Sequence, residues 1–188
     1  QQTTEAGKPY LCLSDFVRPL SSGITDKAGV VATSVDHSFT PLHSDDAYQR
    51  LLAQTLSDRL AEAAAEKLHE EVRKTIWGYA PHESLRINEL HQESFQGIRP
   101  AVGYPSLPDL SINFILDQLL DMKSIGIHLT ENGMMQPHAS VSGLMLAHPA
   151  SHYFSVGKID QAQLENYANR RGLPIDQIKK YLASHLSS

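Results

Sequence analysis

Residues 44–78 read SDDAYQRLLAQTLSDRLAEAAAEKLHEEVRKTIWG, and this stretch decides the fold class. Apolar residues recur in it every four positions, and the recurring set is Leu52, Leu56, Leu60, Ala64, Leu68, Val72 and Ile76. This stripe is broadened by Leu51, Ala53, Ala63 and Ala65. No glycine or proline interrupts the pattern before Gly78. The spacing therefore predicts one helix of about 30 residues, roughly 45 Å long, that starts near Ser44-Asp45-Asp46 and buries this leucine stripe.

Shorter elements are expected on both sides of the long helix. The predicted strands are residues 10–13, 28–35, 127–129, 139–146 and 153–157, the last two forming a hairpin. The predicted helices are residues 84–93, 112–122, 161–171 and 175–186, and a turn is expected at 134–138. The buried side of helix 112–122 is expected to carry Ile115, Leu116, Leu119 and Leu120.

These elements mix without a regular alternation of strand and helix. The sequence therefore predicts a single α+β domain over residues 1–188, with a mostly antiparallel twisted sheet, one long helix and several shorter helices. Residues 1–9 are polar and are expected to be flexible.

The composition excludes several classes of protein. Of 188 residues, 41% are hydrophobic, and 16 basic against 21 acidic residues give a formal net charge of −5, without the basic patch that nucleic-acid binding needs. Apolar runs are too short to span a membrane and no signal peptide is visible, so we expect a cytoplasmic protein without nucleic-acid or membrane partners. The single Cys12 allows no internal disulfide and is expected to be buried between leucines, and the ten histidines form no zinc pattern.

A second stretch, QGIRPAVGYP at residues 96–105, concentrates polar chemistry in a stiff loop. Pro100 restricts its own backbone and that of Arg99, whose planar cation suits a carboxylate or a phosphate. Gly103 permits a turn or a close approach to a ligand, and Tyr104 adds an aromatic ring with a polar tip. The alternative interpretation is a kinked connector in which the arginine caps a helix end.

Acidic residues near this loop suggest a ligand that carries both charges. Glu93 precedes Arg99 by six residues, and the two could clamp an ammonium and a carboxylate, or could form a plain surface ion pair. Glu62 lies beside the apolar stripe of the long helix, and Tyr153 is either a ligand contact or a core aromatic residue. A serine hydrolase is a weak interpretation, because no Gly-x-Ser-x-Gly motif is present.

Several ordered blocks closely resemble the C-terminal activation domain of cobalamin-dependent methionine synthase. The resemblance runs from about Tyr10 to Leu186. Its blocks are DRLAEA at 58–63, LHEEVRK at 68–74, WGYAP at 77–81, QGIRPAVGYP at 96–105, LTE at 129–131, ASVSG at 139–143 and His148-Pro149-x-x-x-Tyr153.

The resemblance implies a function in repairing an oxidised cobalamin enzyme of methionine biosynthesis. Such a domain binds S-adenosylmethionine and presents it to cobalamin, which another domain carries. Flavodoxin or an equivalent reductase supplies an electron, and the methyl group is transferred to cobalt. The parent enzyme is a methyltransferase that moves a methyl group from 5-methyltetrahydrofolate to homocysteine, with zinc only in its other parts. The isolated domain is not expected to be active alone.

The resemblance also implies roles for residues, none of them a metal ligand or a catalytic group. Arg99 would hold the ligand carboxylate, and Tyr104 would lie near the sulfonium and the corrin. The expected S-adenosylmethionine-binding set is Arg99, Pro100, Ala101, Val102, Gly103, Tyr104, Glu62, Glu93 and Tyr153. The expected cobalamin-facing set is Tyr104, Pro137, His138, Ala139 and Ser140.

One departure from the family leaves a second hypothesis open. The family has a further segment upstream, including an aspartate that contacts the ligand, and we expect this chain to lack it. The chain is then either a fragment of a larger enzyme or a shortened relative. The alternative function is a non-catalytic interaction or regulatory module that keeps the fold without the S-adenosylmethionine groove.

Overall fold

The computed structural model describes residues 7, 9–36 and 45–187. Its centre is an antiparallel pair of strands, β1 (Gly29–Ser34) and β4 (Ser140–Met145), in which Gly29 pairs with Met145 and Ser34 with Ser140. A smaller antiparallel pair joins β2 (His128–Leu129) to β3 (Met135–Gln136). The α+β class and the antiparallel pairing are thus as the sequence predicts.

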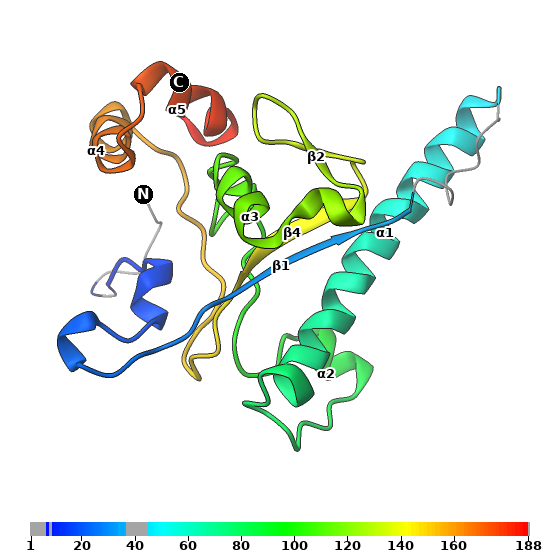
Figure 1. Cartoon of the computed structure of the whole chain (residues 1–188), viewed down its shortest axis with the longest axis horizontal. Helices are drawn as coiled ribbons and strands as arrows, with labels where there is room; N and C mark the ends of the chain where they lie inside the picture. The colour runs from blue at the N-terminus through cyan, green and yellow to red at the C-terminus, as the bar shows by residue number, and fades with distance from the viewer. Residues whose placement is uncertain (1–6, 8, 37–44, 188) are drawn as a thin grey trace.

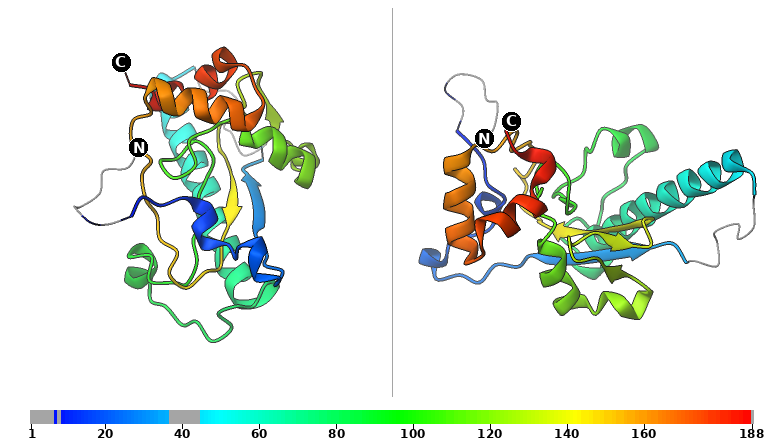
Figure 2. Two further views of the ribbon diagram at one scale, coloured as in Figure 1. Left: turned by 90° about the vertical axis from the view of Figure 1, so that its left-hand side faces the viewer. Right: turned by 90° about the horizontal axis from the view of Figure 1, so that it is seen from above.

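Helices cover both faces of the central strands. Helix α1 (Ala47–Glu71) crosses one face and α3 (Ile112–Leu120) the other, an arrangement visible from above in Figure 2. On β1, the side chain of Thr33 reaches α1 by donating a hydrogen bond to the Ala61 carbonyl at 3.3 Å, whereas Val30 packs in the cluster of Leu116 on α3. This alternation follows from the two-residue period of a strand.

The remaining elements complete the two ends of the molecule. Helix α2 (Ile87–His91) lies at one end, and α4 (Gln161–Arg171) and α5 (Ile175–Tyr181) form a separate apolar cluster at the other (Figure 1). A π-helical turn, η4 (Val72–Ile76), extends α1. The 3-10 turns are η1 (Leu13–Phe16), η2 (Leu20–Ser22), η5 (Met122–Ile125) and η6 (Ala183–His185).

The long helix is present, and Ala53 and Ala65 are buried as predicted, but the prediction that the leucine row forms the buried face is wrong. Its buried residues are Ala53, Ser57, Ala61, Ala65 and His69, whereas Leu52, Leu56 and Leu60 are between 44% and 51% exposed. Small side chains let the helix axis approach the two-stranded sheet closely, and leucines at the same positions would hold it away. The leucine row lies one position earlier on the neighbouring, exposed face.

The start of α1 is confirmed at the predicted place. Asp46 caps the helix by accepting a hydrogen bond from the Tyr48 amide at 2.8 Å, and Ser44 lies outside the described residues. The expected flexible segment 1–9 likewise lies almost entirely outside them.

Four further predictions of local structure are wrong. Residues 10–13 form no strand: Asp15 accepts the Cys12 amide at 2.7 Å and starts the turn η1, which leaves Cys12 exposed. Residues 153–157 form no hairpin with β4, because they run against the loop at residues 96–107, where the Val156 amide donates to the Pro105 carbonyl at 3.0 Å. The predicted turn at 134–138 contains β3.

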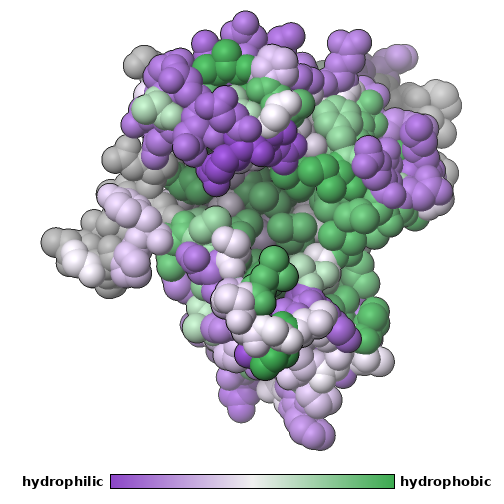
Figure 3. All heavy atoms as spheres, turned by 60° about the vertical axis from the view of Figure 1, so that its left-hand side comes forward, coloured by the Kyte–Doolittle hydropathy of each residue, from purple (hydrophilic) through white to green (hydrophobic). Residues whose placement is uncertain are grey.

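The fourth wrong prediction concerns the buried face of α3. Ile115 and Leu119 were expected to be buried but are 43% and 65% exposed, because only the face around Leu116 meets the sheet. Together with the α1 leucines they leave apolar side chains at the surface. Figure 3 shows hydrophobic residues gathered in a hollow across the middle of one face, below a hydrophilic rim.

Within the described residues, no helix combines the length and apolar character that a membrane crossing requires.

Candidate functional site

The central loop, residues 96–107, lies along the free edge of β4. The Ile98 amide donates to the Leu146 carbonyl at 2.9 Å, the Leu144 amide to the Pro100 carbonyl at 3.1 Å, and the Val102 amide to the Ser142 carbonyl at 2.9 Å. The loop is therefore held like a third strand, even though proline removes one donor.

Two glycines make this close contact possible. A Cβ on Gly143 of β4 would lie 2.5 Å from the Pro100 carbonyl oxygen, so only glycine fits under the loop. Gly97 has a φ of +88°, and a Cβ there would lie 2.7 Å from both the Leu146 carbonyl oxygen and the Tyr79 hydroxyl. Both positions fix the backbone that carries Arg99.

Arg99 is buried, with 6% of its side chain exposed, and it forms an ion pair with Glu66 of α1. The Arg99 Nη2 donates to Glu66 Oε1 at 2.5 Å, and the Arg99 amide donates to the Tyr153 hydroxyl at 2.9 Å. Within the described residues, Arg99 Nε has no hydrogen-bond partner. Burial raises the pKa of Tyr153, which therefore stays a neutral acceptor for the loop backbone.

A cavity of about 440 Å³, here called the arginine pocket, opens beside Arg99. The charged groups of its walls are one arginine and three carboxylates, a combination that suits a ligand with one negative and more than one positive group. Its lining residues are Glu62, Glu66, Glu93, Arg99, Pro100, Ala101, Tyr104, Pro105, Ser106, Tyr153, Phe154 and Ser155.

Glu93 lines the arginine pocket, but among the described residues the ion pair of Arg99 is with Glu66 and not with Glu93. Glu93 follows α2 in a left-handed backbone conformation, with a φ of +54°, and its side chain is exposed. The structure thus brings Glu93 and Arg99 to one cavity, as the sequence indicates, whereas the ion pair is made by Glu66.

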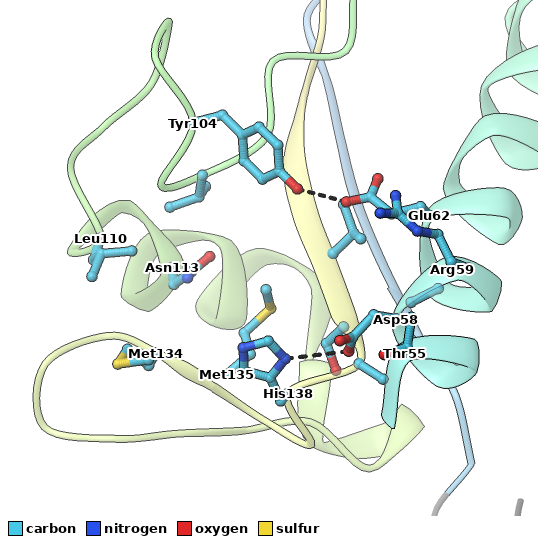
Figure 4. A pocket seen from close by; sticks show the side chains of 15 residues that line it. Thr55, Asp58, Arg59, Glu62, Tyr104, Leu110, Asn113, Met134, Met135 and His138 are labelled. Carbon is cyan, nitrogen blue, oxygen red and sulfur yellow. Dashed lines mark hydrogen bonds and ion pairs between the residues drawn. The ribbon is translucent and has the colours of Figure 1, made fainter. Parts of the chain in front are cut away.

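Tyr104 and Glu62 form the boundary of the arginine pocket. The Tyr104 hydroxyl donates to Glu62 Oε1 at 2.6 Å, across from the central loop to α1 (Figure 4). This hydrogen bond to a carboxylate, together with burial, raises the pKa of Tyr104 to about 12. The phenol is therefore protonated at neutral pH.

A second cavity, of about 580 Å³, lies on the other side of this pair. Figure 4 shows Tyr104 and Glu62 at one end and His138 pointing toward Asp58 of α1, with 3.2 Å between His138 Nδ1 and Asp58 Oδ1. Its lining residues are Thr55, Asp58, Arg59, Ala61, Glu62, Val102, Tyr104, Leu110, Asn113, Met134, Met135, His138, Ala139, Ser140 and Val141.

The expected site residues divide between the two cavities. Val102 lines the second cavity and not the arginine pocket, because successive residues of an extended loop point to opposite sides. Gly103 and Pro137 line neither, although the Pro137 carbonyl accepts the Ser140 hydroxyl at 2.8 Å and so shapes the second cavity's edge. All other expected residues line at least one of the two cavities.

A buried polar cluster supports the end of α1 next to Arg99. Arg73 is 1% exposed, forms a forked ion pair with Glu83 at 2.7 and 2.8 Å, and lies 4.2 Å from the centre of the Phe95 ring. His69 is fully buried against the same ring, and burial, with the charges of Arg73 and Arg99, lowers its pKa to about 3. The cluster thus holds a neutral histidine and a compensated arginine.

Five residues of the arginine pocket are outside the set expected from the sequence: Glu66, Pro105, Ser106, Phe154 and Ser155. Glu66 follows Glu62 by four residues and so shares its helix face, which is a signal the sequence contained. The Ser106 hydroxyl donates to the Phe154 carbonyl and accepts the Phe154 amide at 3.2 Å, a pairing over 48 residues that local patterns do not encode. Among the described residues, no group of three His, Cys, Asp or Glu side chains could hold a metal ion.

Comparison with known proteins gives the same answer for sequence and structure. The sequence profile of the family "Vitamin B12 dependent methionine synthase, activation domain" matches residues 1–172. A crystal structure described as the MetH reactivation domain bound to AdoHcy superposes with a TM-score of 0.87 at 43% sequence identity. That match covers 100% of this chain and 60% of the other chain, so this chain spans about three fifths of the relative's length. The chain belongs to the family of activation domains of vitamin B12-dependent methionine synthases.

Proposed function

We propose that this chain binds S-adenosylmethionine in the arginine pocket and presents its methyl group to a cobalamin carried by another domain. The observation that carries the proposal is the buried Arg99 beside three carboxylates in a cavity of about 440 Å³. S-adenosylmethionine has one carboxylate, one ammonium and one sulfonium, which these groups match in sign. The related reactivation domain was crystallised with AdoHcy, the product of such a transfer.

The residues of this chain bind and orient the ligand. Arg99 would hold the carboxylate, and Glu62 and Glu93 would face the cationic groups. Tyr104 keeps its proton, with a pKa of about 12, so it offers a ring face and no acid or base. When bound, S-adenosylmethionine supplies an electrophilic methyl group for displacement by cobalt, a step that needs positioning and electrostatic fit from the protein.

The second cavity is the proposed approach for the cobalamin domain. It shares Glu62 and Tyr104 with the arginine pocket, so a methyl group held near Tyr104 lies at the boundary between them. His138, Ala139 and Ser140 of its wall are the residues expected to face the corrin. The wider function is reactivation of methionine synthase by reductive methylation, with flavodoxin or an equivalent reductase as the electron donor.

The alternative is an interaction module that keeps the fold without a groove. The arginine pocket argues against it, because a buried arginine beside an open cavity has no structural need of three carboxylates.

Calorimetric titration with S-adenosylmethionine tests the proposal. Arg99→Ala should weaken binding about ten- to hundredfold, the value of a charge-assisted hydrogen bond. Arg170→Ala, which removes an exposed arginine of α4 outside the pocket, should leave binding unchanged. Arg99→Lys keeps the positive charge but loses the planar guanidinium that can donate two parallel hydrogen bonds to a carboxylate. This variant should therefore bind S-adenosylmethionine with intermediate affinity. A folded wild type that binds nothing at millimolar ligand would refute the proposal.

A further inference from the structure

Arg99 and Glu66 make an unequal pair. The Arg99 side chain is 6% exposed and is fixed through the central loop, whereas the Glu66 side chain is 58% exposed on the surface of α1. A buried guanidinium left without a counter-charge is costly, so Glu66 fills this role in the free protein. Glu66 can leave by rotating into solvent, whereas Arg99 has no such freedom.

The nitrogen that Glu66 occupies is the one a ligand carboxylate needs. A forked arginine–carboxylate pair uses either Nε with Nη2 or Nη1 with Nη2, and both arrangements include Nη2. Arg73 and Glu83 show the first arrangement in this protein, through Nε and Nη2. At Arg99, Nη2 already donates to Glu66 at 2.5 Å, and the buried Nε has no partner among the described residues. Nη2 carries a second N–H, so a forked ligand carboxylate would share this nitrogen with Glu66 and lie beside a second negative charge. Repulsion between the two carboxylates favours the departure of Glu66, whose side chain is exposed.

We propose that Glu66 is a resident counter-ion that the ligand carboxylate replaces, so that binding is an exchange of one carboxylate for another. This inference rests on the proposed function and adds a residue that sets affinity. Glu66 lowers affinity by competing for Arg99, and it returns when the product leaves, so that the buried guanidinium is paired in both states. The displaced carboxylate stays at the rim of a pocket that already contains Glu62 and Glu93.

Titration with AdoHcy measures the exchange with little interference from overall charge, because this ligand is a neutral zwitterion. Glu66→Gln should bind AdoHcy about three- to tenfold more tightly, since it removes the competing ion pair. Glu71→Gln removes an equally negative group of α1 that pairs with Lys67 outside the pocket, and it should leave affinity unchanged. 5′-Methylthioadenosine has no carboxylate and should bind wild type and Glu66→Gln equally.

Thermal unfolding gives a second readout. The free Glu66→Gln protein should melt below wild type, because Arg99 loses its partner, and saturating AdoHcy should raise its melting temperature more than that of wild type. Equal or weaker AdoHcy binding by Glu66→Gln would overturn the inference and leave the proposed function standing; weaker binding would mean that Glu66 holds the ligand ammonium. If Glu66→Gln binds AdoHcy and wild type does not, the exchange of carboxylates at Arg99 is supported. If neither protein binds any of these ligands, both the inference and the proposed function are overturned.

Discussion

Substituting Gly143 by alanine should disturb the fold and the site together. Gly143 lies in the middle of β4, where the central loop crosses it, and a Cβ there would lie 2.5 Å from the Pro100 carbonyl oxygen and 3.0 Å from Ala101 Cα. Both of these atoms belong to the backbone, so no side-chain rotation can relieve the contact. The loop has to move away from β4, and with it Arg99.

The expected cost follows from three contributions. Overpacking against a rigid neighbour costs about 1–3 kcal/mol. The hydrogen bonds from the Leu144 amide to Pro100 and from the Val102 amide to Ser142 lengthen, at about 1 kcal/mol each if lost. Alanine also lowers the conformational entropy of the unfolded chain relative to glycine, which stabilises the folded protein by about 0.4–1 kcal/mol and offsets part of the cost. The free energy of unfolding should therefore fall by about 2–4 kcal/mol.

Urea unfolding followed by circular dichroism measures this loss, and calorimetric titration measures AdoHcy binding by the folded variant. Binding should weaken at least about tenfold, because Pro100 and Ala101 line the arginine pocket and small displacements of positioning groups are costly. Gly29→Ala on β1 is the matched control: its Cβ would meet the Met145 side chain at 3.1 Å, so the cost should be smaller and binding unchanged. A Gly143→Ala protein with wild-type stability and affinity would refute this reasoning.

Two further predictions concern protonation. The pKa of His69 is about 3 in the folded protein, against an ordinary value of 6.5. Between these two pH values the unfolded chain therefore binds more protons than the folded protein. The free energy of unfolding should fall as the pH drops from 6.5 toward 3, by up to about 1.4 kcal/mol per pH unit. His69→Gln should flatten this part of the unfolding curve, with His91→Gln as an exposed control, and an unchanged slope would contradict the assignment. Glu62→Gln should lower the pKa of Tyr104 from about 12 toward 10, measured by ultraviolet titration against Tyr104→Phe; an unaltered tyrosine titration would show that Glu62 is not the cause.

The sequence was sufficient to predict α1 because its signals are local. A capping aspartate, an unbroken periodic stretch and a closing Gly78 act within a few turns. The bounds of α4 were predicted for the same reason, and the structure shows Gly172 as its C-terminal cap. The buried face was mispredicted because hydrophobicity and packing disagree there. Leucine is the more apolar residue, but the two-stranded sheet accepts the alanine row that contains Ala61 and Ala65.

The candidate site was predicted in part for similar reasons. Arg99, Tyr104 and the glycine between them stand in one short motif, so their joint placement needs little long-range information. Glu66 pairs with Arg99 over 33 residues, and its choice over Glu93 depends on how far α1 lies from the loop. The wrongly predicted hairpin at 153–157 has the same origin, because only the assembled fold places that segment against the central loop.

The position of the Tyr104–Glu62 pair suits the transfer of a group that carries no proton. These two residues alone among the described ones line both cavities, so a group passing between a ligand at Arg99 and a partner in the second cavity must pass them. Tyr104 is protonated and its proton is committed to Glu62, and His69 is buried behind the loop. Tyr104 and His69 therefore offer the arginine pocket no proton acceptor with a pKa near neutrality. Transfer of a methyl cation equivalent moves no proton and therefore requires only the alignment that this boundary provides.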